Sequence, residues 1–245
     1  IPPLKRQILL ARELMQSNEF HYSTDQAFAL ANALGRLLDQ TYTENLDLKN
    51  LPSLVKEEGL SDHWQITVKF LEILSQKWPQ ILNDIGVIDQ ADRRNRLLLA
   101  LSDYWQAKPA QTPVIAAGST GSIPATAMLL KTISRMPKGT VILPGLDPTL
   151  DLESRDNIED THPQATLYTL LRKMEIEPTS VPLWPYLPKP SILSDIPPTI
   201  AEKRMDMRRF LASETMRPAA TTDHWQNLHL DEDSRHHLNG SLENL

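Results

Sequence analysis

The residues with the clearest chemical potential form a short glycine turn between an apolar run and a helical stretch. Gly118, Ser119, Thr120, Gly121 and Ser122 follow the apolar run 114–117 and lead into a predicted helix, 123–136. Such a turn can present backbone N–H groups to a phosphate, and the dipole of the following helix adds to the attraction. The turn has no lysine, and its glycines do not fit the GxxxxGK[ST] spacing of a P-loop. A structural turn is therefore favoured over a phosphate site.

Basic residues are the second set of candidates, in this case for contact with DNA. They gather in three stretches, which are residues 93–96, 131–138 and 203–209. Lys131 and Arg135 lie four residues apart, as do Arg204 and Arg208, so each pair shares a helix face. Lysine and arginine on such a face can hold DNA phosphates without reading the base sequence. Because acidic residues are interspersed, an ordinary solvated face is the alternative for each stretch.

Catalysis by a metal ion or by acid–base groups has little support in the sequence. The acidic run from Asp147 to Asp160 lacks the Asp…Glu-x-Lys arrangement of a nuclease metal site. The histidines between residues 224 and 237 match neither HExxH nor a Cys/His zinc pattern. We therefore predict a solvated acidic loop and surface histidines, with no catalytic residue, metal site or cofactor in this chain.

Composition narrows the class of protein. The 245 residues are 40% hydrophobic and 23% charged, which allows a packed core. The net charge of −6 argues against a general nucleic-acid coat but leaves room for a local basic groove. The sequence has no cysteine, so disulfides and Cys-ligated zinc or iron–sulfur centres are excluded. With no apolar run of bilayer length and no signal peptide, we expect a cytoplasmic protein without a membrane partner.

Helical periodicity dominates residues 1–108, where we predict a bundle. One helix runs from Pro2 or Pro3 to about Ser17, and Ser23 with Gln26 forms a capping box for the next. Ser61 and Asp89 are predicted N-caps of two further helices. The residues expected to face the core are apolar ones at helical spacing, among them Trp64, Trp78, Leu97, Leu98, Leu101 and Trp105.

The pattern changes over residues 109–245. We predict parallel strands at Val114–Ala117 and Val141–Leu143, joined by helix 123–136, because parallel strands need a crossover of this length. The fold class is therefore α/β and predominantly helical. The remaining expectations are helices at 161–174 and from 198 or 199 to 211, a short helix with Trp225, an irregular proline-rich stretch at 177–198 and a weakly patterned tail at 231–245.

Much of the chain resembles the AddB subunit of the bacterial AddAB helicase–nucleases, in its α-proteobacterial form. The phrases that carry the resemblance occur in the family's order and are ALGRLLDQ (33–40), DHWQITVKFLEILSQKWPQIL (62–82), DQADRRNRLLLAL (89–101), VIAAGSTGSIPATA (114–127), VILPGLD (141–147), THPQ (161–164) and LASETMRPAATTDHW (211–225). The family protein is far longer, so the chain resembles an internal stretch of its N-terminal half.

The resemblance implies a helicase-like region without motor function. It assigns an inserted helical subdomain to residues 1–108 and part of a RecA-like, P-loop NTPase-like core to residues 109–245. In helicase motors the corresponding strand ends in two acidic residues that hold Mg²⁺ and orient the attacking water. Ala117 and Gly118 stand there in this chain, and neither can do so.

The implied role is that of a non-catalytic scaffold in DNA double-strand-break repair and recombination. The implied partners are DNA, as double-strand ends or single strands, and an AddA-like motor and nuclease subunit. ATP binding and hydrolysis belong to the larger assembly. Two alternatives stay open, namely an independent small phosphate- or nucleotide-binding protein built on the βαβ unit and a helical protein-interaction module.

Overall fold

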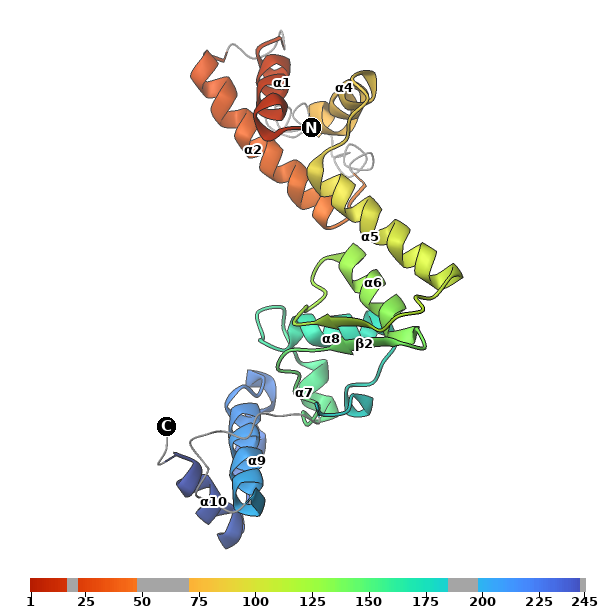
Figure 1. Cartoon of the computed structure of the whole chain (residues 1–245). Coiled ribbons are helices and arrows are strands. Elements are labelled where there is room, and N and C mark those ends of the chain that lie inside the picture. The colour runs from red at the N-terminus through yellow and green to blue at the C-terminus, as the bar shows by residue number, and fades with distance from the viewer. Residues whose placement is uncertain (17–21, 48–70, 185–197, 243–245) are drawn as a thin grey trace. The chain divides into compact units, whose positions relative to one another are not determined.

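The computed structural model describes residues 1–16, 22–47, 71–184 and 198–242 (Figure 1). Over these residues the protein is predominantly helical, with one two-stranded parallel sheet. The chain divides into two compact units. The first unit comprises Ile1–Thr112 and Ile123–Lys138, and the second comprises Pro113–Ser122 and Gly139–Leu245. The predicted cap at Ser61 and the predicted core residue Trp64 lie outside the described residues.

The first unit is built of helices. They are α1 (Pro3–Gln16), α2 (Thr24–Thr43), a π-helical turn (Ile73–Lys77) that continues into α4 (Trp78–Asp84), α5 (Gln90–Ala107) and α6 (Pro124–Arg135). The predicted capping box at the start of α2 is confirmed. The Gln26 N–H donates to Ser23 Oγ at 3.3 Å, and the Ser23 N–H donates to the Gln26 side chain at 3.0 Å. These bonds satisfy two amides that have no partner within the helix.

A single apolar cluster joins α1, α2 and α4. Its central side chains are Leu10, Leu14, Leu38, Leu74 and Trp78, all fully buried. Burying each of them stabilises the fold by roughly 1.5–3 kcal/mol relative to exposure. The prediction that Trp78 is a core residue is therefore confirmed, and the helical spacing of the apolar positions in α1 and α2 accounts for this cluster.

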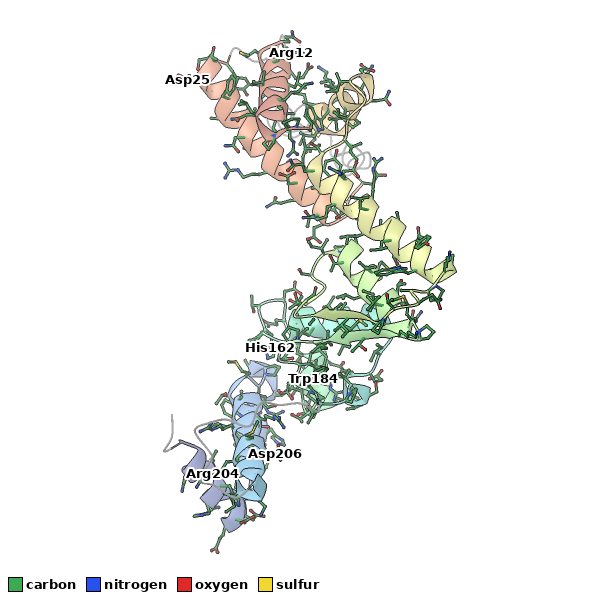
Figure 2. The ribbon with its side chains drawn as sticks, viewed as in Figure 1. Arg12, Asp25, His162, Trp184, Arg204 and Asp206 are labelled. Carbon is green, nitrogen blue, oxygen red and sulfur yellow. The ribbon has the colours of Figure 1, made fainter. Side chains whose placement is uncertain are left out.

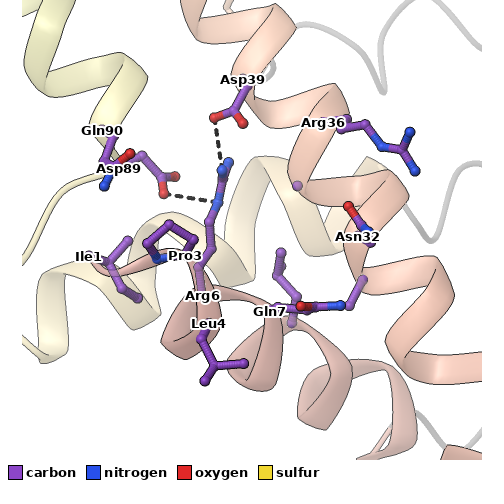
Figure 3. A pocket seen from close by; sticks show the side chains of 13 residues that line it. Ile1, Pro3, Leu4, Arg6, Gln7, Asn32, Arg36, Asp39, Asp89 and Gln90 are labelled. Carbon is purple, nitrogen blue, oxygen red and sulfur yellow. Dashed lines mark hydrogen bonds and ion pairs between the residues drawn. The ribbon is translucent and has the colours of Figure 1, made fainter. Parts of the chain in front are cut away.

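Asp89 occupies the predicted N-cap position of α5, but its side chain does not cap the helix. It is fully buried, accepts a hydrogen bond from Trp78 Nε1 at 2.8 Å, and lies 3.0 Å from Arg6 Nε. Arg6 also reaches Asp39, so it stands between two carboxylates on the wall of a pocket of about 330 Å³ (Figure 3). Burial raises the pKa of Asp89, although the Trp78 hydrogen bond and the charge of Arg6 partly oppose the rise. Asp89 thus ties α1 and α4 to the start of α5.

Helix α5 exposes apolar side chains and buries polar ones. Leu97 is 59% exposed and Leu101 is 36% exposed, so the prediction that they face the core is wrong. Asn95 and Ser102 are buried instead, because each finds a hydrogen-bond partner on another helix. Asn95 Nδ2 donates to the Tyr42 carbonyl at the end of α2, and Ser102 Oγ bonds Thr132 of α6. Long-range polar contacts therefore decide which face of α5 is inside.

The second unit contains the sheet. Strands β1 (Val114–Ala117) and β2 (Gly139–Ile142) pair in parallel, with Val114 opposite Gly139 and Ala117 opposite Ile142. The predicted parallel pairing is confirmed, and so is the helix between the strands, which is α6. β2 begins at Gly139 rather than Val141, because Gly139 and Thr140 take part in the pairing with β1.

The remaining described elements of the second unit are helices. They are α7 (Leu152–Asp156), α8 (Ala165–Met174), a 3-10 turn (Pro178–Ser180), α9 (Pro198–Thr215), a 3-10 helix (Ala219–Asn227) and α10 (Glu232–Leu242). The proline-rich residues 185–197 lie outside the described part of the chain.

Two sequence expectations in this unit, a solvated acidic loop and surface histidines, are partly wrong. The acidic run 147–160 is not entirely a loop, because Asp151 accepts the Ser154 N–H at 2.8 Å and starts α7. The weakly patterned tail forms α10, which begins where Asp231 accepts the Ser234 N–H at 2.7 Å. Short aspartate caps explain both helices, whose apolar spacing is weak. His237 on α10 is buried beside Asp233, so it is not a surface histidine.

In the described parts of the chain, no helix has the length and apolar character needed to cross a membrane.

Candidate nucleic-acid interface

A groove of about 430 Å³ lies between α5 and α6 and collects cationic, aromatic and thioether side chains. We call it the α5–α6 groove. Its lining residues include Trp105, Gln106, Met128, Lys131, Thr132 and Arg135. Lys131 and Arg135 stand one turn apart on α6, as their spacing predicts, and both face this groove. The structure thus brings together two of the four basic residues predicted to contact DNA.

Buried hydrogen bonds hold the floor of the α5–α6 groove. Ser102 Oγ lies 2.7 Å from Thr132 Oγ1, and both side chains are buried. Gln106 Nε2 donates to the same Thr132 oxygen at 3.1 Å. Each of these polar groups has a hydrogen-bond partner, so the bonds that fix α5 against α6 offset the cost of removing these groups from water. The cations of α6 are therefore presented from a rigid base.

Trp105 gives the groove an aromatic wall. It is half-buried rather than in the core, so its predicted place inside a bundle is only partly realised. Met128, which is 44% exposed, lies on the same groove. An aromatic ring with nearby cations suits a nucleotide, because the base can stack while the cations meet phosphates. Sequence reasoning missed Trp105, since its spacing on α5 is indistinguishable from that of a core residue.

Two amides of the glycine turn at the end of β1 are hydrogen-bonded within the protein. Gly118 and Gly121 have φ values of 77° and 61°, which favour glycine. The Gly118 N–H donates to the Ile142 carbonyl at 3.1 Å, and the Gly121 N–H donates to Ser119 Oγ at 3.3 Å. Two of the five amides expected to meet a phosphate are therefore engaged within the protein. Ile123 is the N-cap residue of α6.

Arg204 and Arg208, the other predicted DNA contacts, lie on α9 and are both half-buried. Arg204 packs against α10, where a Cβ on Gly240 would come within 2.5 Å of the Arg204 guanidinium (Figure 2 labels Arg204). On the same helix, Lys203 Nζ pairs with Asp233 of α10 at 2.8 Å. These contacts give Arg204 a role in joining α9 and α10.

A buried arginine joins the end of α9 to α7. Arg217 donates to both carboxylate oxygens of Glu214, to Ser154 Oγ at 2.7 Å, and to Asp151. Burial alone would favour the neutral form of Asp151, but the hydrogen bonds from Arg217 and Ser154 prevail and lower its pKa to about 2. The pKa of Arg217 is raised, chiefly by its hydrogen bonds to Glu214 and despite burial. All of these groups are paired with one another, so the cluster is structural.

Among the described residues, no group of three or more His, Cys, Asp or Glu side chains is placed to hold a metal ion. The acidic run that includes Asp147 illustrates this. Its carboxylates face different partners: Asp147 Oδ1 accepts from the Thr149 N–H at 2.8 Å, whereas Asp151 binds Arg217.

Comparison with known proteins adds no relative. No protein-family model matches the chain, and neither a curated protein nor a solved structure is significantly similar to it.

Proposed function

We propose that this chain is a non-catalytic, helicase-like part of a DNA-end-processing helicase–nuclease subunit of the AddB type. In this proposal the first unit includes the inserted helical subdomain, and β1, α6 and β2 belong to a RecA-like core without ATPase chemistry. The main support is the parallel pairing of β1 with β2 around a crossover helix, with Ala117–Gly118 where a motor has two acids. The resemblance of the sequence phrases to AddB is the reason for proposing this family.

The same proposal gives the α5–α6 groove the role of a DNA contact. Lys131 and Arg135 bind phosphates, and Trp105 stacks on a base of a single strand. The net charge of −6 makes binding by the chain alone weak, because phosphates are repelled elsewhere on the surface. An AddA-like motor subunit supplies ATP hydrolysis, strand cutting and the remainder of the DNA path.

The independent phosphate-binding alternative has less support. A phosphate turn needs outward amides, and those of Gly118 and Gly121 are bonded to Ile142 and Ser119. The turn also lacks the lysine that would reach the β- and γ-phosphates.

The test is a titration of fluorescent single-stranded and duplex-end oligonucleotides with the whole chain, followed by anisotropy at several salt concentrations. We expect weak binding without sequence preference that falls steeply with salt. For single strands, Lys131→Glu/Arg135→Glu should also reduce the slope of log K against log salt by about 1.4, since each phosphate contact contributes roughly 0.7. Arg12→Glu is the matched control, because Arg12 is an exposed cation on α1.

Binding that depends on base sequence or ignores salt would contradict the DNA role. ATP turnover provides a separate check. The chain should not hydrolyse ATP measurably with Mg²⁺, and steady turnover that a Gly121 substitution abolishes would overturn the non-catalytic assignment.

A further inference from the structure

Helix α5 carries an exposed apolar stripe with basic ends. Leu97, Leu101 and Tyr104 are 59%, 36% and 56% exposed, respectively. Arg93, one turn before Leu97, is exposed, and so is Lys108, where the helix ends. We call these five residues the α5 stripe. At 100° per residue they all fall within a sector of roughly 80° on one side of the helix.

Contacts on the opposite face of α5 hold the helix in the orientation that exposes the stripe. The opposite face holds Ala91, Asn95 and Ser102, which are buried. Asn95 donates to the Tyr42 carbonyl, and Ser102 bonds Thr132 at 2.7 Å. Rotating α5 to bury Leu97 and Tyr104 would break both contacts and leave polar groups unpaired, which costs about 1–3 kcal/mol for each group. The fold therefore fixes the apolar face outward.

The spacing of the apolar residues is that of a helix–helix seam. Leu97, Leu101 and Tyr104 are separated by four and then three residues, which is the d, a, d order of a heptad. Contiguous exposed apolar side chains with a polar rim are typical of protein interaction sites. The apolar part is about 10 Å long, from the rise of 1.5 Å per residue, so the contact is small.

The charges at the two ends of the α5 stripe indicate what covers it. Both are positive, and the acidic residues Asp92 and Asp103 lie roughly 120–140° from the midline of the stripe. Asp92 is also bonded to Arg96. A second copy of α5 would place positive ends against positive ends in either orientation when the ends align, which is destabilising. A partner with carboxylates beyond both ends of an apolar seam has the complementary pattern.

We propose that the α5 stripe docks an amphipathic helix of a partner protein, with apolar residues at heptad spacing and acidic residues flanking them. Leu97, Leu101 and Tyr104 form the seam, and Arg93 and Lys108 set the orientation and the charge preference of the partner. This surface does not depend on DNA binding in the α5–α6 groove.

The probe is a fluorescein-labelled synthetic helix of about 15 residues, with leucine at the seam positions and glutamate at both ends. A sister peptide has lysine in place of the glutamates. Titration of each peptide with the whole chain, followed by anisotropy, should show tighter binding of the acidic peptide by about tenfold at low salt. The difference should shrink as salt is added, because the end charges are exposed.

Variants locate the site. Leu97→Gln/Tyr104→Gln should weaken binding of the acidic peptide by about tenfold or more, without loss of melting temperature, because both side chains are exposed. Ile8→Gln on α1, where Ile8 is 46% exposed, is the matched control and should leave binding unchanged. Arg93→Glu/Lys108→Glu should reverse the preference between the two peptides.

Three results would overturn the proposal: no binding of the acidic peptide, equal binding of both peptides, or equal binding by the Leu97→Gln/Tyr104→Gln variant. Sedimentation equilibrium tests the alternative occupant of the stripe, which is a second copy of the chain. A dimer of the chain that disappears in the same variant would assign the stripe to a second copy and exclude the acidic partner.

Discussion

Gly121 packs directly against Leu170, so a Cβ added to the glycine would lie 2.5 Å from Leu170 Cδ1. Leu170 on α8 is only 1% exposed, so its side chain is enclosed by other protein atoms and cannot move aside freely. The φ of Gly121 is 61°, a value that a side chain also disfavours. The turn after β1 is therefore glycine for two reasons, one local and one set by packing against α8.

Gly121→Ala should destabilise the protein by about 2–4 kcal/mol, since backbone strain of roughly 1–2 kcal/mol adds to overpacking of a similar size. Gly118→Ala is the matched comparison. Gly118 has a φ of 77°, but its Cβ would meet no atom within 4 Å, so it should show only the strain. Urea denaturation of both variants measures the difference. Equal losses would mean that the contact with Leu170 is unimportant.

Arg217→Met should destabilise the second unit by about 2–4 kcal/mol, because it leaves the Glu214 carboxylate poorly hydrated and without its cation. Arg217→Lys should recover little of this loss, since one ammonium cannot reproduce the two bonds from Arg217 Nε and Nη2 to Glu214. Thermal unfolding followed by circular dichroism measures both. Arg172→Met, a change at an exposed arginine on α8, is the control, and a similar loss there would refute the role of the cluster.

Acid should weaken the contact between Asp151 and Arg217. The pKa of Asp151 is lowered from 3.8 to about 2, so the folded state binds this proton less readily than the unfolded state. The stabilisation is present above pH 4 and is lost as the pH falls towards 2. Asp151→Asn should therefore show a shallower decline of melting temperature across that window than the wild type. An identical decline would show that Asp151 does not carry the effect.

Asp89 should behave in the opposite way. Burial raises its pKa, so the folded state binds the proton more readily than the unfolded state. The contribution of this group to stability should rise as the pH falls from neutrality towards 4, and Asp89→Asn should remove that part of the pH dependence. Nuclear magnetic resonance titration of the Asp89 carboxyl carbon tests the direction directly. A titration midpoint below 3.8 would contradict it.

Charge reversal should separate the two pairs of basic residues. Lys131→Glu/Arg135→Glu should lower DNA affinity with little change in melting temperature, because both side chains line an open groove. Arg204→Glu should lower the melting temperature, because Arg204 packs against Gly240 on α10. Anisotropy and thermal unfolding of the two variants provide the comparison. Loss of DNA binding in Arg204→Glu without loss of stability would return Arg204 to the DNA contacts.

Local signals in the sequence are sufficient to predict the sheet and the starts of several helices. The apolar run at 114–117, the glycines of the turn and the proline at the start of α6 each have a direct backbone consequence. The Ser23–Gln26 box is likewise local. These features could be predicted because each depends on residues within one or two turns.

The orientation of α5 could not be predicted in this way. Leu97 and Leu101 look like core residues by spacing, but Asn95 and Ser102 have partners 53 and 30 residues away in the sequence, namely Tyr42 and Thr132. Trp105 was not predicted as a groove residue for the same reason, because its position also depends on the orientation of α5. Asp89 was placed correctly at the start of α5, but its buried bonds to Trp78 and Arg6 were not foreseeable from a capping pattern.

Helix α6 belongs to the first unit, whereas the two strands that flank it in the sequence belong to the second. This arrangement limits where proteolysis could separate the two units. Each unit is made of two separate stretches, so no single cut of the backbone separates them. Cleavage between Thr112 and Pro113 would part Ser102 from the segment that supplies Thr132. Cleavage of the backbone within α6 would likewise break the covalent link between the paired strands β1 and β2. Limited proteolysis should therefore nick this protein without yielding two intact halves.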